Sequence, residues 1–215
     1  MKLVYDRRYN IGFLGLERFH PFDSRKYGRA WKAVGREVRR LRDRAWVGVP
    51  RPASDADLAA VHDPAYLLTL RDPTVLAVAL ELPFVRRLPS WAVRWAILRP
   101  MRWAVAGSLV AAREALACGL AVNLSGGYHH AKPARGEGFC VFNDIAYLVH
   151  RLRAEGRLGP TTGWYTSTST RTRATASATT SGPTRRCSST TPSTPAFTRP
   201  TTARPAPGST ARSRC

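Results

Sequence analysis

Apolar residues recur at helical spacing along the first part of the chain. Between Ser24 and Ala45 five of them are spaced by 4, 3, 4 and 3 residues, which places them on one face of a single expected helix: Tyr27, Trp31, Val34, Val38 and Leu41. Arg and Lys fill the other face, which we interpret as solvated. A second helix is predicted over Met101–Cys118, with Gly119 as its stop, and a third over Asp144–Arg153.

Short apolar runs between these helices predict strands. The runs are Leu3–Tyr5, Val47–Val49 and Ala121–Leu124. The last one follows a helix and a glycine and leads into Ser125-Gly126-Gly127, an order of elements typical of a parallel α/β sheet. Because functional residues of such sheets gather at the carboxyl ends of strands, we expect chemistry directly after Leu124.

Polar caps and prolines predict only short helices between residues 54 and 100. Ser54 is expected to begin one that stops near Asp63-Pro64, and another should pass through Tyr66 and end at Asp72-Pro73. Three further prolines argue against a long unbroken helix over residues 83–100: Pro83, Pro89 and Pro100.

The composition of the chain changes abruptly after Gly159. From Thr161 to Cys215 there is no Asp, Glu or Lys, and 26 of these 55 residues are Ser or Thr. Such a segment has little apolar surface to bury, so we expect it to be disordered. The sequence therefore predicts the N-terminal part of one domain over residues 1–160 and a low-complexity Arg/Ser/Thr/Pro tail over 161–215.

The net charge of +20 admits two interpretations. A strongly basic chain is typical of proteins that bind nucleic acid. However, 30 of the 34 basic residues are Arg and only 4 are Lys, and Arg, Ala, Gly and Pro all have GC-rich codons. We favour the composition of the gene as the cause, and expect any binding of nucleic acid to be non-specific.

Cysteine spacing and the N-terminus indicate a soluble, cytoplasmic protein. The four cysteines form no CxxC pair, as expected in a reducing compartment: Cys118, Cys140, Cys187 and Cys215. The N-terminus lacks the apolar core of a signal peptide. The longest uncharged stretch of the apolar middle is the ten residues Trp103–Ala112, about half of a membrane span, so we expect no contact with a membrane.

The candidate chemistry lies in two glycine-containing segments. Gly126 and Gly127 precede His129 and His130, and Gly138-Phe139-Cys140 and Asn143-Asp144 follow within fifteen residues. Neighbouring imidazoles can serve as a base and acid pair for attack of water on a carbonyl, can bind metal, or can be hydrogen-bonded scaffolding. Cys140 is interpreted as a packing residue, and Asp144 either orients a neighbouring loop or begins a helix.

Together these residues resemble the histone deacetylase family, with N-terminal segments similar to its class IV branch: Val4-Tyr5, Tyr9-Asn10, Gly15-Leu16-Glu17 and His20-Pro21-Phe22-Asp23. The resemblance covers residues 3 to about 158. It implies a zinc-dependent hydrolase of acyl-lysine, in a protein or a small acylated amine, on an arginase/deacetylase-like α/β fold. By position, His129 and His130 would be catalytic, whereas Gly138 and Phe139 would bind substrate along the apolar stem of the acyl-lysine.

The family's zinc ligands are absent from this chain. The resemblance implies two ligands in an Asp-Leu-Asp-x-His segment on the next strand, and a third Asp and a Tyr further on. The expected place holds Gly163–Ala176, which contains only poor zinc ligands. We therefore assign no metal ligand in this sequence, and expect the family's Zn²⁺ not to be held tightly.

The genetic code offers an explanation for this loss. If each residue from Thr168 to Ala176 is read as the last two bases of an overlapping codon, the nine residues admit Asp-Leu-Asp-Ala-His-Gln-Gly-Asn-Gly in order. Residues Thr194–Arg199 likewise admit Asn-Ala-Gly-Ile-Tyr-Pro. Our hypothesis is a frameshift equivalent to the loss of one nucleotide before about Thr162, which leaves an incomplete α/β fold and an inactive chain. The alternatives are a basic nucleic-acid-binding protein and a pseudoenzyme that still binds acyl-lysine.

Overall fold

A computed structural model describes residues 1–12, 25–37 and 39–159 of the chain. Their centre is a sheet of three short parallel strands: β1 (Lys2–Val4), β2 (Trp46–Val47) and β3 (Ala121–Asn123), in the order β2-β1-β3. In register, Leu3 lies opposite both Trp46 and Val122. The predicted α/β class with a parallel sheet is confirmed, and all three strands lie within or beside the apolar runs that predicted them.

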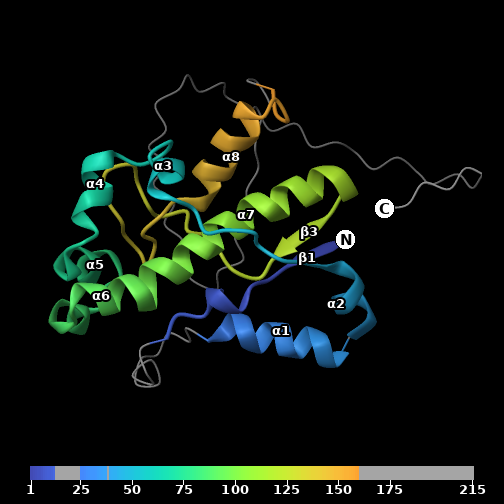
Figure 1. The fold of residues 1–215 in the computed structure, drawn as a ribbon, viewed down its shortest axis with the longest axis horizontal. Coiled ribbons are helices and arrows are strands. Elements are labelled where there is room, and N and C mark those ends of the chain that lie inside the picture. Colours follow the sequence, from blue (N-terminus) through green and yellow to red (C-terminus); the bar gives the residue numbers. More distant parts are fainter. Residues whose placement is uncertain (13–24, 38, 160–215) are drawn as a thin grey trace, which may run out of the picture. The chain divides into compact units, whose positions relative to one another are not determined.

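Helices lie on both faces of this sheet (Figure 1). α7 (Arg99–Cys118) packs along β1 and β3, while α1 (Lys26–Glu37) and α2 (Arg39–Ala45) lie on the opposite side. The core between α7 and the sheet is apolar, with Val4, Ala104 and Val105 fully buried. α8 (Asp144–Ala154) packs against α7 and buries Tyr147, Leu148 and Leu152.

The single helix predicted over Ser24–Ala45 corresponds to two described helices, on either side of residue 38, which lies outside the described residues. α1 ends at Glu37 and α2 begins at Arg39. Tyr27 on the predicted apolar face is buried, and Trp31 is partly buried because it stacks on Tyr5, with ring centroids 4.8 Å apart. The described side chains on the predicted face are thus buried or partly buried, whereas the side chains of residues 38 and 41 lie outside the described part of the chain.

Residues 54–98 form a series of short helical turns: α3 (Asp55–Leu58), α4 (Pro64–Thr69), α5 (Pro73–Ala79), the 3₁₀ segment η3 (Pro83–Arg87), α6 (Ser90–Val93) and the π-helical η4 (Arg94–Leu98). Ser54 caps α3 as predicted, and its hydroxyl accepts from the N–H of Asp57 at 3.1 Å. The preceding helices stop before each of the two Asp-Pro pairs, as predicted, and each pair also begins the next helix. Asp63 and Asp72 each cap the helix that the next proline opens, because proline at the first helical position lacks only an N–H that has no partner there.

Residues 83–100 form no long unbroken α-helix, as expected, but Pro100 lies inside a helical path that leads into α7. The chain passes from α6 through η4 into α7 without leaving helical geometry. Proline has no N–H for the carbonyl four residues earlier, and a π-helical turn next to it accommodates this loss. α7 then ends at Gly119 as predicted, with φ at +81° and its N–H donated to the carbonyl of Ala115.

Strand β3 lies at one end of the strand order, and no described strand pairs with its outer edge. Three apolar side chains on and before it are exposed: Leu116, Leu120 and Val122. Among the described helices, none combines the length and the hydropathy needed to cross a lipid bilayer. The predicted disordered tail, residues 161–215, lies outside the described residues.

Candidate active site

The histidine pair follows the carboxyl end of β3, as the sequence predicted. Gly126 and Gly127 both have positive φ, at +92° and +78°, so the chain turns sharply out of the strand. His129 and His130 come directly after this turn and are exposed. Their ring centroids lie 4.1 Å apart with the ring planes inclined by 39°. The turn therefore presents two adjacent imidazoles at the surface of the sheet's carboxyl edge.

The carboxylate of Asp144 holds this turn in place. It is fully buried and accepts hydrogen bonds from the backbone N–H of Gly127 at 2.9 Å and of Tyr128 at 2.7 Å. The hydroxyl of Ser108, from α7, donates to the same carboxylate. Asp144 is also the first residue of α8. It therefore both begins a helix and orients the loop, and these were the two roles that the sequence left open.

Gly126 fits beside Asp144 only because it has no side chain. A Cβ at this position would lie 2.4 Å from the Ser108 hydroxyl oxygen and 2.5 Å from an Asp144 carboxylate oxygen. Such distances are far inside van der Waals contact, and the φ of +92° is also unfavourable for other residues. The first glycine of the pair is thus required by both packing and backbone geometry.

A buried histidine and an asparagine fix the other end of the loop. His62 is 3% exposed, and its Nδ1 lies 3.1 Å from the Lys132 carbonyl while its Nε2 accepts from the N–H of Asn143 at 2.9 Å. A carbonyl can only accept, so Nδ1 carries the proton. Asn143 caps α8 through Ala146 and also donates to the carbonyl of Ala131, directly after the histidine pair. Burial lowers the pKa of His62 and so favours its neutral form.

The Gly138-Phe139 segment lies beside the histidine pair. A Cβ on Gly138 would lie 3.1 Å from Cγ of His130, so the glycine backbone packs directly against that ring. Phe139 has φ at +63°, a left-handed conformation that is unfavourable for a non-glycine residue, and its N–H donates to the Ala79 carbonyl at 3.1 Å. The fold thus packs Gly138 against His130, with His129 and Phe139 as their neighbours in the chain.

One ring nitrogen of His129 makes a hydrogen bond within the turn. Its Nδ1 lies 2.9 Å from the carbonyl of Gly127, to which it donates a hydrogen bond. Nε2 is then the unprotonated nitrogen, available as an acceptor or a base. An exposed imidazole oriented by its own turn can take a proton from water, while the carboxylate of Asp144 bonds the backbone of the loop and not the His129 ring.

Cys140 is a packing residue in this site. It is buried, and burial raises the pKa of its thiol to about 11. A thiol with so high a pKa is protonated at neutral pH and is a poor nucleophile. The sequence-based interpretation of Cys140 as a core residue agrees with this geometry.

The donor set around the histidine pair does not fit a zinc ion. Catalytic zinc has three protein ligands, usually His and carboxylate. In the described part of the chain, no three His, Cys, Asp or Glu side chains come together in a way that could hold a metal. A cavity of about 680 Å³ beside His129 has His150 on its wall, but its other lining residues supply no carboxylate or thiol.

Sequence reasoning missed the residues that support the loop. His62 and Tyr66 come from far earlier in the chain, and the Tyr66 hydroxyl donates to the Val141 carbonyl at 2.9 Å. Ser108 lies in the middle of an Ala-rich helix. Val61-His62 and Tyr66-Leu67 also resemble the class IV branch, but that resemblance gave no sign of their hydrogen-bond partners, whereas a lone hydroxyl residue such as Ser108 in an apolar helix needs a polar partner.

Comparison with known proteins identifies the family. The histone deacetylase domain matches residues 20–159 of the chain. Histone deacetylase 2 of Arabidopsis thaliana is 38% identical over 150 residues, which are 70% of this chain and 38% of that protein. Histone deacetylase 8 of Xenopus laevis is 33% identical over 118 residues, 48% of this chain and 33% of that protein. A solved structure of a histone deacetylase homologue from Aquifex aeolicus superposes with a TM-score of 0.48 at 22% identity, over 72% of this chain and 41% of the other.

The chain belongs to the histone deacetylase domain family. It spans well under half the length of these curated relatives. The resemblance that the sequence motifs indicated is therefore confirmed. The described residues carry this family's match on a parallel α/β sheet.

Proposed function

We propose that this chain is a deacetylase of acyl-lysine or of similar amides by descent, and that it is inactive as written. The observation that carries the proposal is the contrast at the site. The turn, the histidine pair and the Gly138-Phe139 segment are assembled and supported by buried hydrogen bonds, whereas the described residues supply no set of metal ligands. The missing ligands are those that the family's Zn²⁺ would need.

The position of the similarity supports a frameshift as the cause. The family match ends at residue 159, two residues before the composition changes at Thr161. Out of frame, Thr168–Ala176 are compatible with the Asp-Leu-Asp-x-His segment that carries zinc ligands in the family. We propose that residues 1–160 are the N-terminal part of a deacetylase domain and that 161–215 are an out-of-frame tail.

The retained residues have definite roles in this proposal. His129 and His130 are the catalytic pair, with Nε2 of His129 free to accept a proton from water because Nδ1 bonds Gly127. Phe139 and Gly138 bind the stem of an acyl-lysine, in a protein or a small acylated amine. The active form of the protein works in the cytoplasm, in keeping with the absence of CxxC pairs.

Restoring the frame tests this proposal directly. Two proteins are compared: the chain as written, and the product of the same gene with one nucleotide added before the Thr162 codon. The restored protein should bind about one equivalent of zinc and hydrolyse an Nε-acetyl-lysine amide in a chelator-sensitive way. The chain as written should do neither. A restored protein with both His129→Ala and His130→Ala is the control for background hydrolysis.

Two outcomes of this comparison would contradict the proposal. If the chain as written retains about one equivalent of zinc and loses measurable turnover on treatment with a chelator, residues 160–215 supply ligands and the proposal is wrong. If the restored protein neither binds zinc nor turns over, the frameshift is not the cause of the missing ligands.

The alternative functions have weaker support. Exposed basic residues line α1 and α2, which is the surface that a nucleic-acid binder would use: Lys32, Arg36, Arg39, Arg40 and Arg44. Binding to DNA or RNA that weakens steeply with salt would favour this alternative. A pseudoenzyme that binds acyl-lysine through Phe139 would instead bind an acetyl-lysine peptide without zinc and without turnover.

A further inference from the structure

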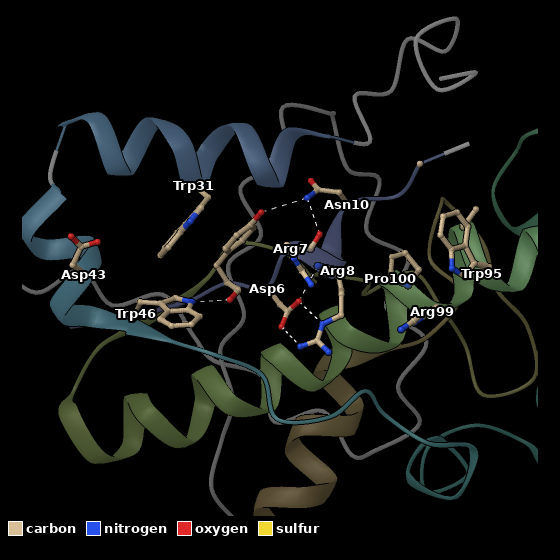
Figure 2. Close-up of a pocket in the computed structure, with 13 residues that line it drawn as sticks. Asp6, Arg7, Arg8, Asn10, Trp31, Asp43, Trp46, Trp95, Arg99 and Pro100 are labelled. Atoms are coloured by element: carbon tan, nitrogen blue, oxygen red, sulfur yellow. Dashed lines mark hydrogen bonds and ion pairs between the residues drawn. The ribbon is translucent and has the colours of Figure 1, made fainter. Parts of the chain in front are cut away.

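A second cavity, of about 980 Å³, shares no lining residue with the histidine loop. As Figure 2 shows, the residues that line it come from the N-terminal segment, α1 and α2, β2, η4 and the start of α7. Aromatic rings and arginines dominate the lining, and six side chains matter here: Tyr5, Trp31, Trp46, Trp95, Arg7 and Arg99. This combination of π-surfaces and guanidinium groups has no use in the deacetylase chemistry described above.

The aromatic side of the cavity is held in place by contacts within the protein. Trp31 stacks on Tyr5, with centroids 4.8 Å apart and planes inclined by 17°. The indole N–H of Trp46 donates to the carbonyl of Tyr5 at 3.0 Å. These contacts fix two indole rings, yet 54% of Trp46 remains exposed. At the other end of the cavity Trp95 is 56% exposed. A planar ring can therefore stack on Trp46 without first ordering it, and Trp95 offers a second exposed indole.

The acidic residues of the cavity are already paired. Asp6 forms a two-point ion pair with Arg8, with distances of 2.7 and 2.6 Å, and Arg8 also lies 3.3 Å above the Trp103 ring. Burial alone would raise the pKa of Asp6, but its bonds to Arg8 outweigh this and hold the pKa below its ordinary value. Asp43 lies 3.8 Å from Arg39 on α2. Neither carboxylate therefore adds an unbalanced negative charge.

Two arginines of the cavity have no such partner. Arg7 and Arg99 are exposed, and within the described residues neither guanidinium group makes a hydrogen bond or an ion pair. Both lie between the Trp31–Trp46 side and the Trp95 side of the cavity (Figure 2). Guanidinium groups match the geometry of phosphate oxygens and bind them through two parallel hydrogen bonds. The cavity thus has unsatisfied positive charge bordered by exposed indole rings.

We propose that this cavity binds a nucleoside monophosphate or a chemically similar aromatic phosphate. The aromatic base stacks on Trp46 or Trp95, and the phosphate pairs with Arg7 and Arg99. The site is independent of the histidine pair and of the proposed deacetylase lineage. The same chemistry could come from a free nucleotide or from one nucleotide of a single strand, and the experiment separates the two sources.

The test follows tryptophan fluorescence of the full chain during titration with AMP. AMP should change the fluorescence in a saturable way, while adenosine and ribose 5-phosphate, which each lack one half of the ligand, should bind at least about tenfold more weakly. Arg7→Gln and Arg99→Gln should each raise the Kd for AMP by about tenfold or more. Trp46→Ala or Trp95→Ala should raise it by roughly tenfold, according to which indole carries the base.

Matched controls come from the neighbouring turn. Trp91→Ala and Arg94→Gln change an exposed indole and an exposed arginine that do not line the cavity, and should leave the Kd within about twofold. All variants keep the eight arginines of residues 161–215, so binding through the tail would be unaffected by any of them. Circular dichroism confirms that each variant remains folded.

A single-stranded oligonucleotide distinguishes the two sources. If it binds no tighter than AMP and competes with it, the ligand is a free nucleotide; if it binds much tighter and the same arginine variants weaken it, the ligand is one unit of a strand. The proposal is overturned if AMP produces no saturable change up to millimolar concentration. It is equally overturned if the variants of Arg7 and Arg99 bind AMP as well as the controls do.

Discussion

Replacing Asp144 by asparagine changes the one carboxylate that holds the histidine turn. Asparagine keeps the shape but puts an NH₂ group in place of one carboxylate oxygen. If its carbonyl still accepts from the N–H of Tyr128, the NH₂ faces the N–H of Gly127, and two donors meet in a buried site. An unsatisfied buried N–H costs about 1–3 kcal/mol, and the remaining bonds change from charged to neutral. The smaller desolvation cost of the amide offsets part of this, so we expect a loss of about 2–4 kcal/mol in the free energy of unfolding.

Urea denaturation followed by tryptophan fluorescence measures this loss. Hydrogen exchange adds a local test, because the amides of Gly127 and Tyr128 should lose protection in Asp144→Asn. Asp63→Asn is the matched control, since Asp63 is an exposed helix cap and asparagine caps equally well. The control should shift stability by less than about 0.5 kcal/mol. An Asp144→Asn protein as stable as this control, with both amides still protected, would refute the assigned role of the carboxylate.

Three further predictions follow from the geometry of the same region. Gly126→Ala should lower the free energy of unfolding by more than about 2 kcal/mol, because its Cβ would clash with Ser108 and Asp144. Gly119→Ala, at a similar φ but with open space around it, should lower it by only about 1 kcal/mol. Thermal denaturation of both variants separates the cost of the clash from the cost of the backbone conformation. Cys140→Ser should leave the fast phase of thiol labelling at pH 8 unchanged, because burial raises the pKa of the Cys140 thiol to about 11, and a smaller fast phase would contradict this. Burial lowers the pKa of His62, so the unfolded chain binds more protons than the folded one, and stability should fall as the pH drops below the ordinary histidine pKa of about 6.5. In urea titrations at pH 5 and 7, His62→Gln should remove this contribution to the pH dependence. An unchanged pH dependence in the variant would contradict the role given to His62.

Local signals made much of the fold predictable. Gly119 ends α7, and Ser54 caps α3, because each of these effects depends on residues within one helical turn. The Asp-Pro pairs at 63 and 72 show the limit of such signals, since the same dipeptide can close one helix or open the next.

The candidate site was predictable in its parts but not in its support. Glycines followed by two histidines at the end of an apolar run identified the turn from sequence. The bonds that hold it join residues 16 and 17 positions apart for Asp144, and 81 positions apart for His62 and Asn143. Neither spacing belongs to a helical or strand period, so only the folded chain reveals which polar groups meet.

The outer edge of β3, with which no strand of the described residues pairs, has a consequence for handling the protein. An open edge beside exposed apolar side chains is a template for strand pairing between molecules. The net charge of +20 opposes such contacts by mutual repulsion at low ionic strength. Adding salt, the usual remedy for an arginine-rich protein that adheres to columns and nucleic acid, shortens the range of that repulsion. High-salt buffers should therefore promote precipitation of this chain, and dilute, low-salt buffers should keep it monomeric.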